Sequence, residues 1–187
     1  MNTKIFVQGA TKPYDQQERA LTWLGNLLKE KRCICLVGDK GKIPDILRAT
    51  GVRCQRHALG LDGDKKEATG TIYYQKVAKE IIENHHLAGG EKEIAWGLRL
   101  GDWIGESKGF VFLYGSAGTL AHLFPVLTFG KKTWSQKGYP RKVVLLGWPK
   151  HKVYAIKLLY GFDKTTYWFK SFDLDQVDKA VDFLITY

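Results

Sequence analysis

The fold is decided by residues 109–120, which read Gly-Phe-Val-Phe-Leu-Tyr-Gly-Ser-Ala-Gly-Thr-Leu. The four apolar residues 110–113 predict a buried strand, and the glycines and small residues behind them predict a tight turn. Apolar residues then recur at helical spacing through Leu123 and Leu127. A buried strand that passes directly into a helix is typical of a layered α/β domain with a mainly parallel sheet.

The rest of the chain alternates in the same way. Further strands are predicted at 5–7, 33–37, 52–57 and 143–146, with a short edge strand at 167–169. Apolar residues at helical spacing predict helices over 13–32, 43–49, 77–82, 94–104, 153–159 and 174–185. Residues 60–66 combine glycine with charge, which predicts an exposed loop.

Length and composition favour one domain over residues 1–187. A chain of 187 residues with 44% hydrophobic content can bury one sizeable core. No apolar run is long enough to cross a bilayer, and the run at 5–7 is too short for a signal peptide, so we expect a cytoplasmic protein. Cys33, Cys35 and Cys54 are odd in number and imply neither a disulfide framework nor a zinc site. We expect no metal and no cofactor.

The charge of the chain favours anionic ligands without identifying one. Lysine and arginine number 29 against 19 aspartates and glutamates, which gives a formal net charge of +10. Such a surface attracts anions from phosphorylated metabolites to nucleic acids, and it also keeps a protein soluble. The basic residues are dispersed rather than gathered into a tract. Nucleic-acid binding therefore ranks last among the function classes.

Three glycine-containing turns follow predicted strands, where ligands bind in open α/β sheets. They lie at residues 9–11, 38–41 and 115–119. The third is the sharpest, because small residues let a phosphate approach the backbone N–H groups at the start of the next helix. The predicted phosphate or nucleotide contacts are Gly9, Ala10, Gly38, Gly115, Ser116, Ala117, Gly118 and Thr119. The alternative is a tight strand-to-helix connection that binds nothing.

Arg99, followed by the stretch 109–120, resembles the signature of the LONELY GUY (LOG) phosphoribohydrolases, which are often labelled lysine decarboxylases. The resemblance is specific over residues 96–132 and consistent in element order elsewhere. It implies a Rossmann-like, three-layer nucleotide-binding domain. It also implies a homodimer that cleaves a nucleoside 5′-monophosphate into a free base and ribose 5-phosphate.

The same resemblance assigns roles to individual residues. Gly115, Gly118 and Thr119 would hold the phosphate, and Arg99 would match the catalytic arginine. Three positions depart from the family pattern, which has proline, glycine and glutamate where this chain has Tyr114, Ser116 and His122, respectively.

The glutamate position decides between two functions. Cleavage of a ribosyl bond builds positive charge on the sugar, which a carboxylate stabilises and a neutral imidazole does not. The leading hypothesis is therefore a protein that binds a nucleotide or another phosphorylated ligand without the family reaction. The alternative is an N-glycosidase in which His122 acts as the base beside Arg99, since an imidazole can accept a proton near pH 7. In a third interpretation His122 is a helix residue that points past the pocket.

Other residues near Arg99 have simpler interpretations. Glu91 and Glu93 could lend a carboxylate, although a solvated helix face explains them. Helical spacing suggests ion pairing for Asp102 and Glu106. Trp96 and Trp103 share a helix face with Arg99, where core packing is the default and stacking on a base is the alternative. The two neighbouring histidines, His85 and His86, predict a helix end rather than a metal site.

Overall fold

The core of the molecule is one seven-stranded sheet in which every neighbouring pair is parallel. The structure is a computed structural model that describes residues 3–38, 41–58, 71–85, 90–134 and 141–186. The strand order is β4-β3-β2-β1-β5-β6-β7. The strands are β1 (Lys4–Gln8), β2 (Ile34–Gly38), β3 (Arg53–Ala58), β4 (Thr71–Tyr73), β5 (Gly109–Leu113), β6 (Lys142–Leu146) and β7 (Phe169–Phe172).

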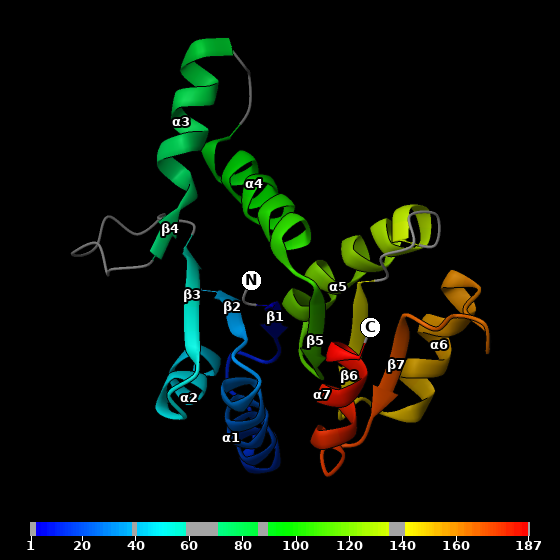
Figure 1. The fold of residues 1–187 in the computed structure, drawn as a ribbon. Helices are drawn as coiled ribbons and strands as arrows, with labels where there is room; N and C mark the ends of the chain where they lie inside the picture. The colour runs from blue at the N-terminus through cyan, green and yellow to red at the C-terminus, as the bar shows by residue number, and fades with distance from the viewer. Residues whose placement is uncertain (1–2, 39–40, 59–70, 86–89, 135–140, 187) are drawn as a thin grey trace.

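Helices cover both faces of the sheet, which gives the three-layer, Rossmann-like arrangement that the sequence predicts. In Figure 1 the helices α1, α2 and α7 lie below the sheet, and α4 and α5 lie above it. The helix α3 packs against α4. The helices are α1 (Asp15–Glu30), α2 (Ile43–Ala49), α3 (Tyr74–His85), α4 (Glu91–Glu106), α5 (Ala117–Phe129), α6 (Lys150–Tyr160) and α7 (Val177–Ile185), and the π-helix η1 (Gly130–Trp134) extends α5.

Alternating side chains of the central strands form two cores, one on each face. On β1, Phe6 packs toward α4 and α5, whereas Ile5 and Val7 pack toward α1 and α7. All five residues of β5 are buried. A strand that is apolar on both faces has to be covered on both, so these strands require the layered arrangement.

Most element predictions are confirmed within three residues at each end, and the differences are largest in the second half of the sheet and at its β4 edge. The edge strand β7 begins at Phe169, because Tyr167 lies in a turn in which its N–H bonds the Thr165 carbonyl at 2.9 Å. The helix α7 begins at Val177, since a hydrogen-bonded turn of 3.0 Å between the Gln176 N–H and the Asp173 carbonyl precedes it. The three-residue strand β4 has no counterpart in the sequence prediction. The predicted loop at 60–66 lies outside the described residues.

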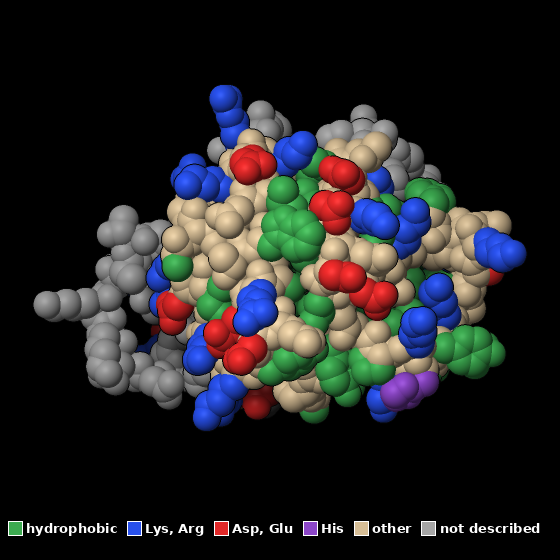
Figure 2. Space-filling view, turned by 90° about the horizontal axis from the view of Figure 1, so that it is seen from below, with side chains coloured by type: hydrophobic (Ala, Val, Ile, Leu, Met, Phe, Trp, Pro, Cys, Tyr) green, Lys and Arg blue, Asp and Glu red, His purple; other side chains and the backbone are tan. Residues whose placement is uncertain are grey.

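The surface below the sheet mixes both signs of charge. Figure 2 shows lysine and arginine side chains interspersed with aspartate and glutamate over this face. This distribution agrees with the dispersed basic residues of the sequence. Among the helices that the structure describes, none is long and apolar enough to cross a membrane.

Candidate functional site at the switch point of the sheet

The sheet order creates a switch point between β1 and β5. From β1 the chain builds outward through β2, β3 and β4, and from β5 it builds in the opposite direction through β6 and β7. The two central strands pair directly, with Val7 opposite Val111 and Gln8 opposite Phe112. Their following turns therefore meet at the carboxyl edge, where open α/β sheets bind ligands.

Glycine is required where these two turns touch. A Cβ atom on Gly115 would lie 2.9 Å from the Ala10 backbone nitrogen, 3.1 Å from the Gly9 carbonyl carbon and 2.2 Å from Thr119 Oγ1. A Cβ atom on Gly9 would lie 2.9 Å from Leu113 Cβ. The structure thus brings the first and third predicted turns into contact.

The turn after β2 joins the other two through the turn after β1. The Lys42 N–H donates to the Thr11 carbonyl at 3.1 Å. Gly41 has φ +89°, and a Cβ atom there would lie 2.7 Å from the same carbonyl oxygen. Gly38 ends β2, and among the described residues the one atom within 4 Å of an added Cβ there is Gln8 Oε1, at 3.9 Å. We call residues 9–11, 41–42 and 115–119 the switch-point turns.

The start of α5 presents small, exposed residues at this edge. Ser116 precedes the helix, and Ser116, Ala117 and Gly118 are exposed. Thr119, one of the predicted phosphate contacts, is 1% exposed, so its side chain lies under the turn. An exposed helix start of this kind combines N–H groups with the positive end of the helix dipole.

Arg99 lies buried in the layer between α4 and the sheet. Its side chain is 6% exposed, and its Nη1 donates to the His57 carbonyl at 3.5 Å. The guanidinium carbon lies 4.7 Å from the centre of the Trp103 ring. Arg99 and Trp103 therefore face inward together, as their helical spacing predicts.

His122 is also buried, at 8% exposure, among aromatic rings. Ring centres of Trp103, Trp96 and Phe6 lie 5.0, 5.7 and 6.5 Å away, respectively. Its Nδ1–H donates to the Gly118 carbonyl at 2.7 Å, so a neutral ring keeps the lone pair on Nε2. Burial lowers the pKa of His122, and the charge of Arg99 lowers it further, while the bond to Gly118 opposes both. His122 is therefore neutral at pH 7.

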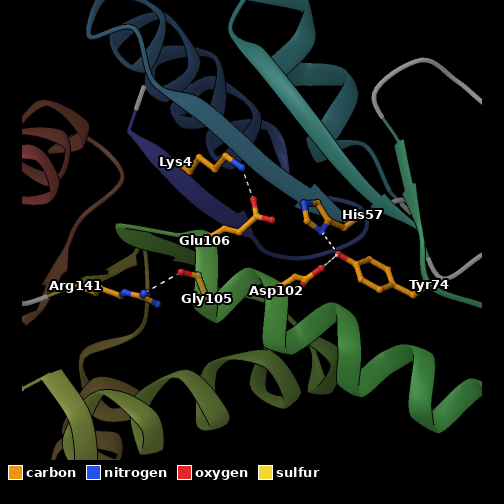
Figure 3. Close-up of polar contacts among 7 residues, drawn as sticks. All are labelled: Lys4, His57, Tyr74, Asp102, Gly105, Glu106 and Arg141. Carbon is orange, nitrogen blue, oxygen red and sulfur yellow. Dashed lines mark hydrogen bonds and ion pairs between the residues drawn. The ribbon is translucent and has the colours of Figure 1, made fainter. Parts of the chain in front are cut away.

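A hydrogen-bonded chain beside Arg99 was not predicted from the sequence. His57 Nδ1–H donates to the Tyr74 hydroxyl at 2.6 Å, and that hydroxyl donates to Asp102 Oδ2 at 2.7 Å (Figure 3). Burial lowers the pKa of His57 to about 4, against the opposing charges of Glu106 and Asp102. Burial, together with the bond to Asp102, raises the pKa of Tyr74. We call His57, Tyr74, Arg99, Asp102 and His122 the α4 polar cluster.

The remaining candidates find other partners. Glu106 forms an ion pair with Lys4 of β1 rather than with a residue of its own helix (Figure 3). Glu91 and Glu93 lie in the first turn of α4, and Glu91 is about 12 Å along the helix axis from Arg99. His85 is the last residue of α3, as predicted, and His86 lies outside the described residues. Within the described ranges no group of three or more metal-ligating side chains gathers.

A cleft of about 580 Å³ opens one strand away from Gly115, lined by parts of α1, residues 147–149 after β6 and residues 173–175 before α7. The Tyr114 ring, next to Gly115 in the sequence, packs on Trp148 of the cleft lining, with ring centres 5.3 Å apart. The buried Gln17 side chain joins α1 to the residue that follows β5, because its Nε2 donates to the Tyr114 backbone carbonyl at 2.8 Å. The carboxyl edge therefore offers two neighbouring features, an exposed turn and a cleft.

Comparison with known proteins identifies the fold and no sequence family. No family model matches the chain, and no curated protein matches it. Among solved structures, the molybdenum cofactor binding protein from the phototrophic bacterium Rippkaea orientalis has a TM-score of 0.63 at 13% identity, covering 100% of this chain and 99% of that one. A Moco carrier protein from Chlamydomonas reinhardtii has a TM-score of 0.62 at 17% identity, covering 99% and 98%.

These neighbours confirm the Rossmann-like α/β fold over the whole chain. At 13–17% identity they say nothing about individual site residues. The assignment to the LOG family finds no family model in its support and stays a prediction.

Proposed function

We propose that this protein binds a phosphorylated small molecule, a nucleotide or a phosphorylated cofactor, at the switch-point turns. One observation carries the proposal: Gly115 lets the turns after β1 and β5 touch, while Ser116, Ala117 and Gly118 stay exposed at the start of α5. Exposed N–H groups at a helix start bind phosphate because they combine hydrogen-bond donors with the positive helix dipole. The net charge of +10 attracts such a ligand.

The solved neighbours suggest which ligand to test beside nucleotides. They are described as molybdenum cofactor binding and carrier proteins. That cofactor is a phosphorylated pterin, so it offers a phosphate and a flat ring, as a nucleotide does. A carrier holds its cargo without reacting with it, which agrees with the loss of the family glutamate at His122.

Calorimetry on one variant tests the phosphate position. In Gly118→Leu the added Cβ atom has one described neighbour within 4 Å, Ser116 Oγ at 3.9 Å, and the position is exposed, so the fold should persist. Titration with adenosine 5′-monophosphate and with the isolated molybdenum cofactor should show at least a tenfold loss of affinity for whichever ligand the wild type binds. Ala49→Leu, at an exposed site at the end of α2, is the matched control and should bind as the wild type does.

The neighbouring cleft supplies the outcome that would contradict this assignment. Trp23 lines the cleft and is 40% exposed. Trp23→Ala should leave phosphate binding intact. If Trp23→Ala lost affinity while Gly118→Leu kept it, the ligand would lie in the cleft, and the switch-point assignment would be wrong.

The geometry of His122 favours binding over hydrolysis. A base has to reach the attacking water, whereas the His122 ring is buried against Phe6, Trp96 and Trp103. We therefore expect wild-type protein incubated with nucleoside 5′-monophosphates to release no free base above the uncatalysed rate. Chromatography of the products measures this, and rapid release that His122→Ala abolishes would establish the N-glycosidase instead.

A homodimer belongs to the same proposal, and the outer face of α4 supports it. Gly97, Gly101 and Gly105 recur every fourth residue, are exposed, and would have no described atom within 4 Å of an added Cβ. Each costs about 1 kcal/mol of helix stability relative to alanine, with no packing reason among the described residues of this chain. A helix of a second copy could approach such a face closely.

Light scattering at tens of micromolar tests the dimer. We expect twice the monomer mass for the wild type and a monomer for Gly101→Leu, because leucine would hold the helices apart. A monomeric wild type would refute the dimer, and the ligand-binding proposal would still stand because it does not depend on the dimer.

A further inference from the structure

The three cysteines lie on two neighbouring strands, away from the switch-point turns. Cys35 of β2 stands directly opposite Cys54 of β3 in the strand register. Both side chains pack on the side of the sheet that α1 and α2 cover, where Cys33 also lies. All three thiols are free.

Only one pair among them has the geometry of a bridge. Directly opposed residues of neighbouring strands have Cα atoms about 4.8 Å apart, and disulfides span Cα separations of about 4.4–6.8 Å. The two side chains lie on the same face of the sheet, and the Cys54 thiol donates to the Val52 carbonyl, with Sγ and O 3.6 Å apart. The Cys33 thiol makes the same kind of bond to the Lys31 carbonyl, with Sγ and O 3.8 Å apart, but Cys33 precedes Ile34, which pairs with Arg53, so it does not stand opposite Cys54.

The Cys35 and Cys54 thiols differ in pKa and in burial. The neighbouring Cys35 thiol lowers the pKa of Cys54, and the charges of Arg48 and Arg56 lower it further, against its partial burial. The neighbouring Cys54 and full burial raise the pKa of Cys35. Cys54 is half-buried, whereas Cys35 is fully enclosed. Cys54 is thus the accessible nucleophile, and Cys35 stands behind it.

We propose that Cys35 and Cys54 form a peroxide-sensitive dithiol that closes reversibly into a disulfide between β2 and β3. The oxidant is a hydroperoxide. The Cys54 sulfur attacks a peroxide oxygen, an S–O bond forms and the O–O bond breaks, leaving a sulfenic acid and one molecule of water or alcohol. The Cys35 sulfur then attacks the Cys54 sulfur, the S–S bond forms, and the hydroxyl leaves with the Cys35 proton as water. Two thiols lose two electrons, and one peroxide is reduced.

The position of the bridge links it to the carboxyl edge. Three residues beyond the cysteines, β2 reaches Gly38 and β3 reaches His57, which are themselves paired in register. Three strand residues span about 10 Å. The disulfide would therefore join the two strands just below the point where one enters a switch-point turn and the other enters the α4 polar cluster.

Mass spectrometry of the full-length wild-type protein tests the proposal without any variant. The folded protein is treated with hydrogen peroxide, its remaining thiols are alkylated, and its peptides are mapped before and after dithiothreitol. We expect two of the three thiols to be lost, a linked peptide pair joining Cys35 to Cys54, and full recovery of the thiols on reduction. Before oxidation, Cys54 should alkylate at least tenfold faster than Cys33.

Three serine variants separate the roles. Cys33→Ser is the matched control and should form the bridge as the wild type does. Cys35→Ser should accumulate a sulfenic acid at Cys54, which dimedone traps, and Cys54→Ser should lose peroxide sensitivity. A wild type that keeps all three thiols under peroxide that fully oxidises free cysteine, or that links Cys33 to Cys54, would overturn the proposal.

Discussion

The switch-point turns and the α4 polar cluster are neighbours built on opposite principles. The turns are three short segments made mostly of glycine and other small residues, and the segment that starts α5 is exposed at Ser116, Ala117 and Gly118, with its polarity supplied largely by the backbone. The cluster is made of large polar side chains from β3, α3, α4 and α5, and most of it is buried. Bonds of 2.6 and 2.7 Å join His57, Tyr74 and Asp102 to one another, whereas the buried Nε2 atoms of His57 and His122 have no hydrogen-bond partner among the described residues.

This difference separates binding from stability. A change in an exposed turn removes donors from a ligand and costs the fold little. A change in the cluster leaves buried polar groups or cavities, whose cost falls on the fold. The two regions should therefore respond differently to substitution, and four measurements test whether they do.

The largest effect is expected for Trp103→Ala. The Trp103 ring is 1% exposed and lies 4.6 Å from Phe6 and 4.7 Å from the Arg99 guanidinium carbon. Its removal should lower the free energy of unfolding by about 3–5 kcal/mol, measured by urea denaturation. The half-buried Trp96 is the control, and Trp96→Ala should cost no more than about 2 kcal/mol. Equal losses would mean that the cluster has no special dependence on Trp103.

The second largest effect is expected in the pH dependence of stability, to which His57 should contribute. Burial lowers its pKa in the folded state to about 4, from an ordinary value of 6.5. As the pH falls through 6.5 the unfolded chain takes up the proton first, so the fold loses stability between pH 6.5 and pH 4, by about 3 kcal/mol from this group. His57→Gln should lack this loss, whereas His151→Gln, at an exposed site on α6, should keep it. Parallel profiles for all three proteins would contradict the buried, neutral assignment.

Gly115→Ala should have a smaller effect on stability. At Gly115 the turns after β1 and β5 are packed as tightly as a protein core. Two of the three nearest atoms to its added Cβ are backbone atoms, at 2.9 and 3.1 Å, so the turns have to move apart. We expect a loss of about 1–3 kcal/mol, measured by urea denaturation, together with weakened ligand binding. Wild-type stability in this variant would show that the contact between the turns is loose.

Gly118→Ala should have the smallest effect and the opposite sign. No atom of the described residues lies closer than 3.9 Å to its added Cβ, and alanine is the better helix former in the first turn of α5. The midpoint of urea unfolding should rise, by up to about 1 kcal/mol in free energy. A destabilised variant would place a contact at Gly118 that the structure does not contain.

The two regions also differ in how far sequence alone predicts them. The turns are local: an apolar run at 110–113 followed by glycines predicts both the strand end and the exposed helix start. The spacing of Arg99 and Trp103 on one helix predicts that they face inward together. The chain through Tyr74 has no such signal, because its bonds join residues 17 and 28 positions apart. No local sequence pattern predicts that His57, a histidine in a strand, begins this series of hydrogen bonds.

The central position of β1 has a consequence for how the chain reaches this fold. One edge of β1 pairs with β2, which follows early in the sequence, with Ile5 opposite Cys35. The other edge of β1 pairs with β5, which comes much later in the sequence, with Ile5 opposite Gly109. Until β5 arrives, that edge carries unpaired N–H and C=O groups beside apolar side chains such as Phe6. Pairing across so long a stretch of chain is slow, because the intervening loop has to close first. The step that completes the switch point is thus also the step that removes an open apolar edge from the middle of the unfinished sheet, and refolding should be prone to aggregation until it is complete.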